Sequence, residues 1–219
     1  TDGDEYNYSI TYNSTFFTGT ESYHYNIAAS GSQLFMASWE LNNVTVANLD
    51  GGRITTTSAY YVGGCGIHGI AVDPSNGDIW AADLDCPDIK RFSSWDFCQQ
   101  ESFLLGSQPV GIAVTSDSLV VADRGNLCVY VIDKFTKQIM STIGIATYLD
   151  ASVDYIEPFV YDGRIYLVGE GIVGVLSMNM DGTDKSQMDI PFGSDTSAMG
   201  IHIESDRIYL NTMQDVVVM

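Results

Sequence analysis

The sequence predicts an all-β protein of the β-propeller class, and three observations carry this prediction. A unit of about 43 residues recurs five times, and its anchor residues are 45, 40, 46 and 43 positions apart. Each unit contains short apolar runs, of which the clearest, Gly-Ile-Ala-Val, occurs at 69–72 and again at 111–114. Turn-forming residues separate these runs, and a period of 40 to 45 residues with several short strands is typical of propeller blades. The anchors are Leu34, Ile79, Leu119, Ile165 and Ile208.

The second unit shows the expected composition of one blade. We predict four antiparallel strands, running outward from the central axis, at 67–72, 78–83, 88–92 and 97–104. The first two are almost wholly apolar, as expected for strands that neighbouring blades cover on both faces. The turn at 74–77 contains Pro, Ser, Asn and Gly, which favour a tight reversal.

Five units account for most of the chain, with expected limits of 25–62, 63–106, 107–150, 151–194 and 195–219. The last unit ends in a third strand with no fourth. The preceding segment, 1–24, contains the alternating stretch 8–12, which we predict to be a strand that completes the last blade. Such closure removes exposed sheet edges. The alternative is part of a six-bladed ring that continues beyond Met219.

Charge and hydropathy exclude several partners. The net charge is −19, which argues against nucleic acid and against anionic membrane surfaces, since both need basic patches. No apolar run of about 20 residues is present, so we expect no membrane span. The acidic group Asp83, Asp85 and Asp88 could bind Ca²⁺ through oxygen ligands, but we favour a solvated loop.

Three N-glycosylation sequons begin at Asn7, Asn13 and Asn43. Three such triplets within 45 residues predict a secreted or cell-surface glycoprotein. Because the sequence does not begin with Met and has no signal peptide, we expect a mature form or an excerpt of a longer chain.

The four cysteines support an oxidising compartment. Cys65 and Cys86 are equidistant from the centre of the hairpin turn between Ser75 and Asn76, so antiparallel pairing predicts a disulfide between them. Cys98 and Cys128 either form a second disulfide, as parity suggests, or are two buried free thiols, as the expected strand geometry suggests.

The stretch 121–131, Val-Ala-Asp-Arg-Gly-Asn-Leu-Cys-Val-Tyr-Val, resembles the repeat of the NHL propellers. Arg164-Ile165-Tyr166-Leu167 followed by Asn179-Met180-Asp181-Gly182-Thr183 resembles the related YWTD repeats, although the Tyr-Trp-Thr-Asp core is absent. The resemblance implies the architecture, because such propellers include enzymes, ligand-binding proteins and scaffolds.

One NHL-type enzyme, a zinc-dependent lyase, has cysteines placed like Cys65 and Cys86 and a His at the start of several inner strands. His68 stands at such a position here. The corresponding positions in the other units are about Asn26, Val110, Glu157 and Met199, and none of them is His. This chain therefore departs from the zinc-site pattern of that enzyme.

Few residues are candidates for chemistry. His68 and Glu157, with His24, could hold a transition metal near the axis, since two His and a carboxylate form a ligand set. His202 falls one position further along its strand, and we expect it to point into the sheet stack. Glycosidases need paired carboxylates, and only Glu157 qualifies at the axis.

These observations predict a secreted, glycosylated, non-catalytic propeller that binds a protein or glycan ligand on one face. Self-assembly, as a subunit of an extracellular surface layer or filament, is a second form of the same prediction. We expect no cofactor, with Ca²⁺ or Zn²⁺ as the alternatives. The alternative function is a metal-dependent lyase or hydrolase of the NHL type with its site at the axis.

Overall fold

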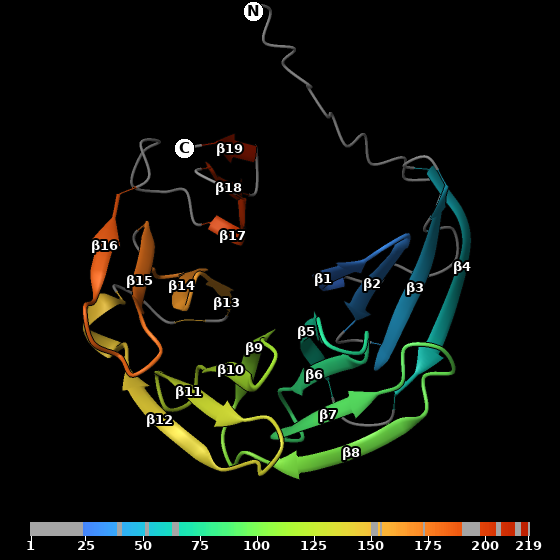
Figure 1. Cartoon of the computed structure of the whole chain (residues 1–219), viewed down its shortest axis with the longest axis horizontal. Coiled ribbons are helices and arrows are strands. Elements are labelled where there is room, and N and C mark those ends of the chain that lie inside the picture. The colour runs from blue at the N-terminus through green and yellow to red at the C-terminus, as the bar shows by residue number, and fades with distance from the viewer. Residues whose placement is uncertain are drawn as a thin grey trace, which may run out of the picture.

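The structure is a computed structural model that describes residues 24–38, 41–50, 53–62, 66–149, 153, 155–172, 174–189, 198–204, 207–212 and 216–218. These residues form 19 strands and one short 3-10 helix, η2 (Ala146–Tyr148). The strands make five antiparallel sheets that follow one another along an arc (Figure 1). Across the described part of the chain, no helix is long and apolar enough to cross a membrane.

Each sheet is formed by consecutive strands. The first contains β1 (His24–Ser30), β2 (Gln33–Ser38), β3 (Asn43–Asp50) and β4 (Arg53–Tyr61). The second contains β5 (Ile67–Val72), β6 (Ile79–Asp83), β7 (Asp88–Phe92) and β8 (Gln99–Leu104). The third contains β9 (Pro109–Val114), β10 (Ser118–Asp123), β11 (Cys128–Asp133) and β12 (Ile139–Gly144). The fourth contains β13 (Ile156–Tyr161), β14 (Arg164–Gly169), β15 (Val175–Asn179) and β16 (Ser186–Met188). The fifth contains β17 (Ala198–Glu204), β18 (Arg207–Thr212) and β19 (Val216–Val218).

The strand order is that of propeller blades. Within every sheet each strand pairs only with its neighbours in the sequence. The first strands of the sheets, β1, β5, β9, β13 and β17, lie on the inner side of the arc (Figure 1). The all-β propeller prediction is therefore confirmed, and the four strands of the second blade lie within two residues of their predicted limits.

The prediction of five four-stranded blades is confirmed for four of the sheets. Among the described residues these four have four strands each, whereas the fifth has three. The strand that we predicted at 8–12 to complete it lies outside the described residues. The first and fifth sheets stand at the two ends of the arc (Figure 1), and no strand pairing joins them within the described residues.

The hydrophobic core lies between successive sheets. In β10, Val120 packs in a cluster with the fourth sheet, and the next residue, Val121, packs in a cluster with the second sheet. Successive side chains of a strand point to opposite faces, so a strand covered on both faces must be apolar at every position. This requirement explains the continuous apolar run of the third blade and its fully buried anchor, Leu119.

Glycines allow the innermost strands to approach at backbone distance. A Cβ on Gly69 of β5 would lie 2.8 Å from the Cα of Gly111 in β9. A Cβ on Gly111 would in turn lie 2.0 Å from the carbonyl oxygen of Ile156 in β13. The recurring Gly-Ile-Ala-Val run is thus required by close packing of the blades around the axis.

Candidate functional site

One aligned position of the innermost strands carries glycine in some repeats and a polar side chain in others. Strand pairing aligns Asn26, Gly69, Gly111, Glu157 and Gly200. Three sheets carry glycine there, while the first and fourth carry a polar side chain. The two polar residues are the ones that contact each other.

Asn26, Tyr155 and Glu157 form a hydrogen-bonded group near the axis. The Asn26 side-chain amide donates to Glu157 Oε2 at 2.6 Å and to the Tyr155 hydroxyl oxygen at 3.3 Å. The Tyr155 hydroxyl donates to Glu157 Oε2 at 3.0 Å. Asn26 and Tyr155 are buried and Glu157 is half-buried. The group therefore links the first sheet to the fourth.

Burial controls the protonation of this group. Removal from water raises the pKa of Glu157 to about 8, although the hydrogen bonds from Tyr155 and Asn26 act to lower it. Burial, reinforced by the Glu157 carboxylate, also raises the pKa of Tyr155 well above its usual value. At neutral pH the group is therefore mostly uncharged, with a proton on Glu157.

His68 directly precedes Gly69, and strand pairing aligns it with Val110 of the third sheet and Met199 of the fifth. Its side chain is buried, and its ring centroid is 6.1 Å from that of Tyr155. Tyr155 thus connects His68 and Glu157, two of the three residues that we predicted as metal ligands.

The third predicted ligand, His24, begins β1, but its side chain is outside the described residues. Among the side chains that the structure describes, no three His, Cys, Asp or Glu residues lie close enough together to hold a metal ion. The axial ligand set with His24 stays a prediction.

We expected His202 to point into the sheet stack, but it does not. Its side chain is exposed, although its ring is in edge contact with Phe159 at 5.7 Å and lies 6.1 Å from the ring of Tyr209. It therefore lies over the boundary between β13 and the fifth sheet.

The acidic group on the second blade is held by a lysine. Lys90 forms a close ion pair with the fully buried Asp83 and a second one, at 3.5 Å, with Asp88. Asp83 also accepts a hydrogen bond from the backbone N–H of Cys86 at 3.1 Å. A protein cation thus supplies the positive charge that we had considered for Ca²⁺.

The cysteines have different states. Cys86 is disulfide-bonded, but its predicted partner, Cys65, lies outside the described residues, so this pairing stays a prediction. Cys98 and Cys128 are free thiols, so of our two alternatives the bridge is wrong and the free thiols are correct, although Cys98 is exposed and only Cys128 is buried. Cys98 precedes β8 at one end of its blade, whereas Cys128 begins β11 at the opposite end of the next blade.

The sequons are only partly within the described structure. Asn43 is the first residue of β3 and is half-buried, with its side-chain oxygen shielded from solvent and without a hydrogen-bond partner. Asn7 and Asn13 lie outside the described residues.

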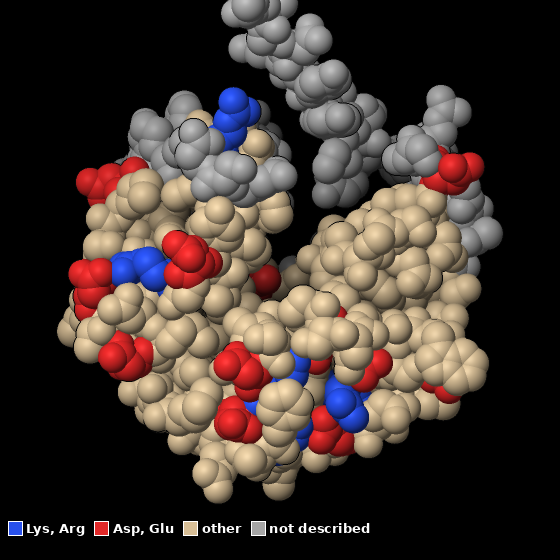
Figure 2. Space-filling view, in the orientation of Figure 1, with Lys and Arg blue, Asp and Glu red and all other residues tan. Residues whose placement is uncertain are grey.

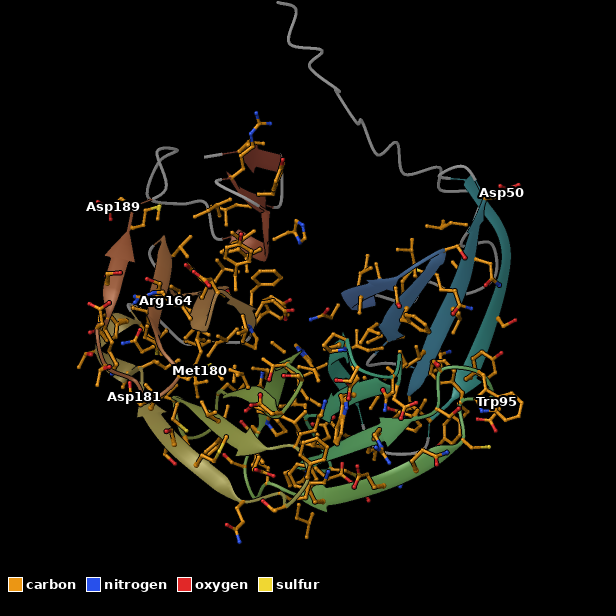
Figure 3. All side chains as sticks on the ribbon, in the orientation of Figure 1. Asp50, Trp95, Arg164, Met180, Asp181 and Asp189 are labelled. Atoms are coloured by element: carbon orange, nitrogen blue, oxygen red, sulfur yellow. The ribbon has the colours of Figure 1, made fainter. Side chains whose placement is uncertain are left out.

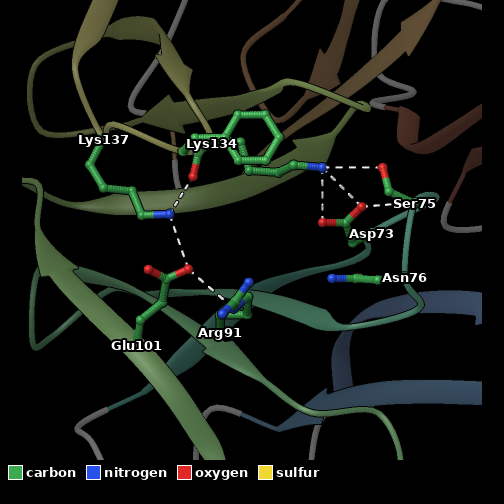
Figure 4. Close-up of a pocket in the computed structure, with 8 residues that line it drawn as sticks. Asp73, Ser75, Asn76, Arg91, Glu101, Lys134 and Lys137 are labelled. Atoms are coloured by element: carbon green, nitrogen blue, oxygen red, sulfur yellow. Dashed lines mark hydrogen bonds and ion pairs between the residues drawn. The ribbon is translucent and has the colours of Figure 1, made fainter.

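A charged pocket of about 290 Å³ lies between the second and third blades (Figure 4). We call it the charged pocket. Lys134 is 5% exposed and contacts Asp73 at 3.0 Å and the carbonyl oxygen of Thr115 at 2.9 Å. Lys137 and Arg91 share Glu101, at 3.0 Å and 3.1 Å. Every cation of the pocket is therefore matched by a carboxylate. Its lining residues are Asp73, Ser75, Asn76, Arg91, Glu101, Lys134, Phe135 and Lys137.

A second pocket, of about 330 Å³, lies between the first and second blades. We call it the uncharged pocket, because none of the described residues that line it carries a charge. They are Gln33, Val46, Asn48, Ser58, Tyr60, Ser94, Trp95 and Phe97. Figure 2 shows acidic and basic side chains over the second, third and fourth blades, whereas almost none appears over the first blade.

The two pockets occupy equivalent places in successive repeats. Strand pairing aligns Val46 and Ser58 of the first blade with Arg91 and Glu101 of the second. The turns at 93–98 and 133–138 have the same backbone hydrogen bonds and the same left-handed residue, Phe97 or Lys137. These turns present Trp95 and Phe135, which are 84% and 73% exposed.

We did not predict either pocket from the sequence. A usable signal was present, because Trp95 and Phe135 each follow their anchor, Ile79 or Leu119, by 16 positions. Figure 3 shows Trp95 at the outer rim of the molecule, beside the hairpin of β7 and β8.

Comparison with known proteins supports the fold. No family model and no curated protein matches this sequence. A solved structure of virginiamycin B lyase from Staphylococcus aureus matches 92% of this chain and 71% of its own, with a TM-score of 0.63 and 13% identity. BamB from Moraxella catarrhalis matches 92% of this chain with a TM-score of 0.57 and 13% identity, and this chain spans 63% of its length.

These similarities define the class of protein, a β-propeller, at a level of identity that establishes the fold alone. The NHL-type repeat remains a resemblance at particular residues.

Proposed function

We propose that this chain is a secreted, glycosylated propeller that works by binding or assembly and not by catalysis. The observation that carries the proposal is the pair of equivalent pockets between successive blades, each beside an exposed aromatic side chain. Trp95 and Phe135 are largely exposed, and an aromatic side chain beside a pocket can contact a bound partner. Repeated sites on one scaffold suit a binding protein.

The hydrogen bonds among Asn26, Tyr155 and Glu157 support a structural role for this group. Asn26 and Tyr155 direct their donors to Glu157, and all three bonds stay within the group. Buried polar groups that satisfy one another stabilise a unique arrangement of the elements that carry them. The group therefore fits a role in holding the first and fourth sheets together.

The outer strand of the fifth sheet, β19, supports the assembly form of the proposal. Among the described residues, β19 pairs only with β18, and Val218 is 54% exposed. An unpaired edge can accept a strand, from elsewhere in the chain or from a neighbouring copy.

The extracellular location rests on the sequons at Asn7, Asn13 and Asn43 and on the disulfide of Cys86. Both features belong to an oxidising secretory route. Because Asn43 is half-buried in β3, we expect its glycan occupancy to be the lowest of the three.

Intact mass of the chain secreted from eukaryotic cells, under native and denaturing conditions, tests this proposal. We expect sugar mass that deglycosylation removes and a native mass above that of one chain. A bare monomer that retains a stoichiometric metal ion would contradict it. A matched control is the triple variant in which Asn7, Asn13 and Asn43 are each replaced by Gln, which should lose the sugar mass.

A second candidate function is an enzyme with Glu157 as a general acid or base at the axis. The observation that favours it is the pKa of Glu157 of about 8, since perturbed carboxyl groups are common in active sites. A lyase is among the solved structures of the same fold, which adds an analogy of fold only. Zinc analysis of the purified chain, with His68→Ala as the control variant, tests this candidate. Stoichiometric zinc that His68→Ala abolishes would favour the enzyme over the binding module.

A further inference from the structure

We propose that the uncharged pocket between the first and second blades binds a neutral saccharide. This inference rests on the proposed function, because it assigns a ligand class to a binding module. It goes further in naming the pocket, the chemistry of the ligand and the residue on which the ligand stacks.

The composition of the pocket selects an uncharged, hydroxyl-rich ligand. Two side-chain amides, Gln33 and Asn48, and the hydroxyls of Ser58, Ser94 and Tyr60 line it. Amides and hydroxyls both donate and accept hydrogen bonds, as sugar hydroxyls do. A charged ligand would meet no counter-charge among the described lining residues, and burying an unmatched charge is costly. The volume of about 330 Å³ falls within the usual range of small-ligand pockets, which is about 300–1,000 Å³.

The amides are already oriented in the structure. Gln33 Nε2 donates to Asn48 Oδ1 at 2.9 Å, across the pair formed by β2 and β3. A fixed amide pair presents its polar atoms without losing rotational freedom when a ligand binds, which favours affinity.

Aromatic side chains form another part of the lining. Phe97 stacks on Tyr60 with ring centroids 4.6 Å apart and also packs against Phe35 and Phe92, at 6.0 Å and 6.2 Å. Trp95, two residues before Phe97 in the same turn, is 84% exposed. The C–H-rich face of a sugar ring packs well on an aromatic face, so the indole offers an apolar surface on which the ligand can stack.

The turn that carries Trp95 is rigid. Its ends are joined by a hydrogen bond from the Ser93 N–H to the Cys98 carbonyl oxygen, and the Phe97 N–H donates to the carbonyl of Ser93. The Cys98 N–H donates to the Asp96 carboxylate at 3.0 Å, so the charge of this turn is engaged by its own backbone. These bonds fix the backbone position from which the exposed indole extends.

The charged pocket shows why the ligand belongs to the uncharged one. At the equivalent positions Val46 is replaced by Arg91, Ser58 by Glu101 and Phe97 by Lys137. The substituted side chains bind one another through Glu101, so the charged pocket supplies its own partners. The described residues of the uncharged pocket form the same framework, with the uncharged side chains of Val46, Ser58 and Phe97 at the positions of this ion-pair network.

Saturation-transfer NMR with the full, deglycosylated chain tests the inference. The probes are the methyl glycosides of glucose, galactose, mannose and N-acetylglucosamine, with glucuronate as the anionic control. We expect transfer to at least one neutral glycoside and none to glucuronate. The variant Trp95→Ala should weaken binding at least about tenfold, because it removes one aromatic stacking contact. Phe135→Ala, the equivalent exposed aromatic at the charged pocket, should leave binding unchanged.

A second variant tests the pocket without changing Trp95, whose replacement could also affect folding. Ser58→Glu adds to the uncharged pocket the carboxylate that the equivalent position carries as Glu101, and Ser58 is exposed, so the fold should tolerate it. We expect this variant to lose saccharide binding while its thermal unfolding stays close to that of the parent.

The outcomes separate this inference from the proposed function. No transfer to any neutral glycoside, transfer to glucuronate alone, or binding that survives both Trp95→Ala and Ser58→Glu would overturn the saccharide site. A chain that fails in this way but remains glycosylated and assembled by native mass would retain the proposed function. Loss of assembly in Trp95→Ala, without saccharide binding in the parent, would make the pocket a protein interface and the saccharide inference wrong.

Discussion

Asn26 donates a 2.6 Å hydrogen bond to Glu157, from the innermost strand of the first sheet to that of the fourth. The two residues are 131 positions apart in the sequence, and the second and third sheets lie between them along the arc. Both occupy the position that is glycine in the other three repeats. At this position two of the five sheets thus carry polar residues that contact each other across the axis, and the other three carry glycine.

The first prediction concerns the proton on Glu157. Its pKa is raised to about 8 in the folded chain from an ordinary value of 4.5. The folded state therefore keeps a proton that the unfolded state loses, so the stability is greatest below the lower value and falls as the pH rises toward 8. Glu157→Gln removes this dependence and should raise the free energy of unfolding, relative to the parent, by up to about 3 kcal/mol at pH 7.

Urea unfolding of parent and variant at pH 4.5, 6, 7 and 8 measures this effect. The control is Glu170→Gln, which changes an exposed carboxylate of the same sheet. Parallel stability curves for the parent and Glu157→Gln would show that Glu157 has an ordinary pKa.

The second prediction concerns the contact between Asn26 and Glu157. Asn26→Ala removes two hydrogen bonds and leaves Glu157 and Tyr155 without their amide donor, which should cost about 1–3 kcal/mol of stability. In a double-mutant cycle with Glu157→Ala, the cost of Asn26→Ala should shrink by about 1 kcal/mol or more, since contacting residues are coupled. Additive effects would place the two side chains apart in solution.

The third prediction concerns the close approach of the innermost strands. Gly111→Ala puts a methyl group 2.0 Å from a backbone oxygen of β13, so the strands must separate. We expect a loss of about 1–3 kcal/mol or more, because backbone cannot move aside as a side chain can. Gly144→Ala is the matched control, because a Cβ there meets no atom within 4 Å. Thermal unfolding that lowers Tm equally in both variants would be inconsistent with close packing at Gly111.

The fourth prediction concerns the buried ion pair of the charged pocket. Lys134→Met leaves Asp73, which is 2% exposed, without its cation and should cost about 3–5 kcal/mol. Lys137→Met is the control and should cost under about 1 kcal/mol, because its pair with Glu101 is more exposed. Equal losses from the two variants would contradict the difference in burial.

The same pair has a pH signature. Burial acts to raise the pKa of Asp73, but hydrogen bonds from the Ser75 amide, Lys134 and Trp80 outweigh it and lower the pKa below 3.8. The stabilisation from Asp73 is therefore present above that value and is lost as the pH falls through the folded pKa. Without Lys134 the loss should begin at a higher pH, which acid unfolding followed by circular dichroism would detect.

Sequence reasoning recovered the parts of the fold that repeat. The apolar anchors and the Gly-Ile-Ala-Val runs predicted the strands of the second and third blades, since both faces of these strands are covered and the pattern is local. The axial meeting of Asn26 and Glu157 was harder to foresee, because it depends on how far five sheets curve. Tyr155, which completes the group, lies before β13 and was not among our candidates.

The same limit applies to contacts between blades. For Cys98 and Cys128 the even number of cysteines suggested a bridge, whereas the expected strand geometry suggested free thiols, and the structure agrees with the geometry. The two pockets were missed because their walls come from different repeats. Trp95 becomes part of a wall only when its turn is placed against β3 and β4 of the preceding blade.

The glycines of the innermost strands also contribute to the curvature of the arc. Gly69 and Gly111 let adjacent sheets touch backbone to backbone at the inner edge, while side chains such as Trp80 and Tyr130 fill the space between the second and third sheets farther out. Adjacent sheets therefore diverge outward like the sides of a wedge. Larger residues at these two positions would separate the inner edges and flatten the curve, so that more sheets would be needed to complete a circle.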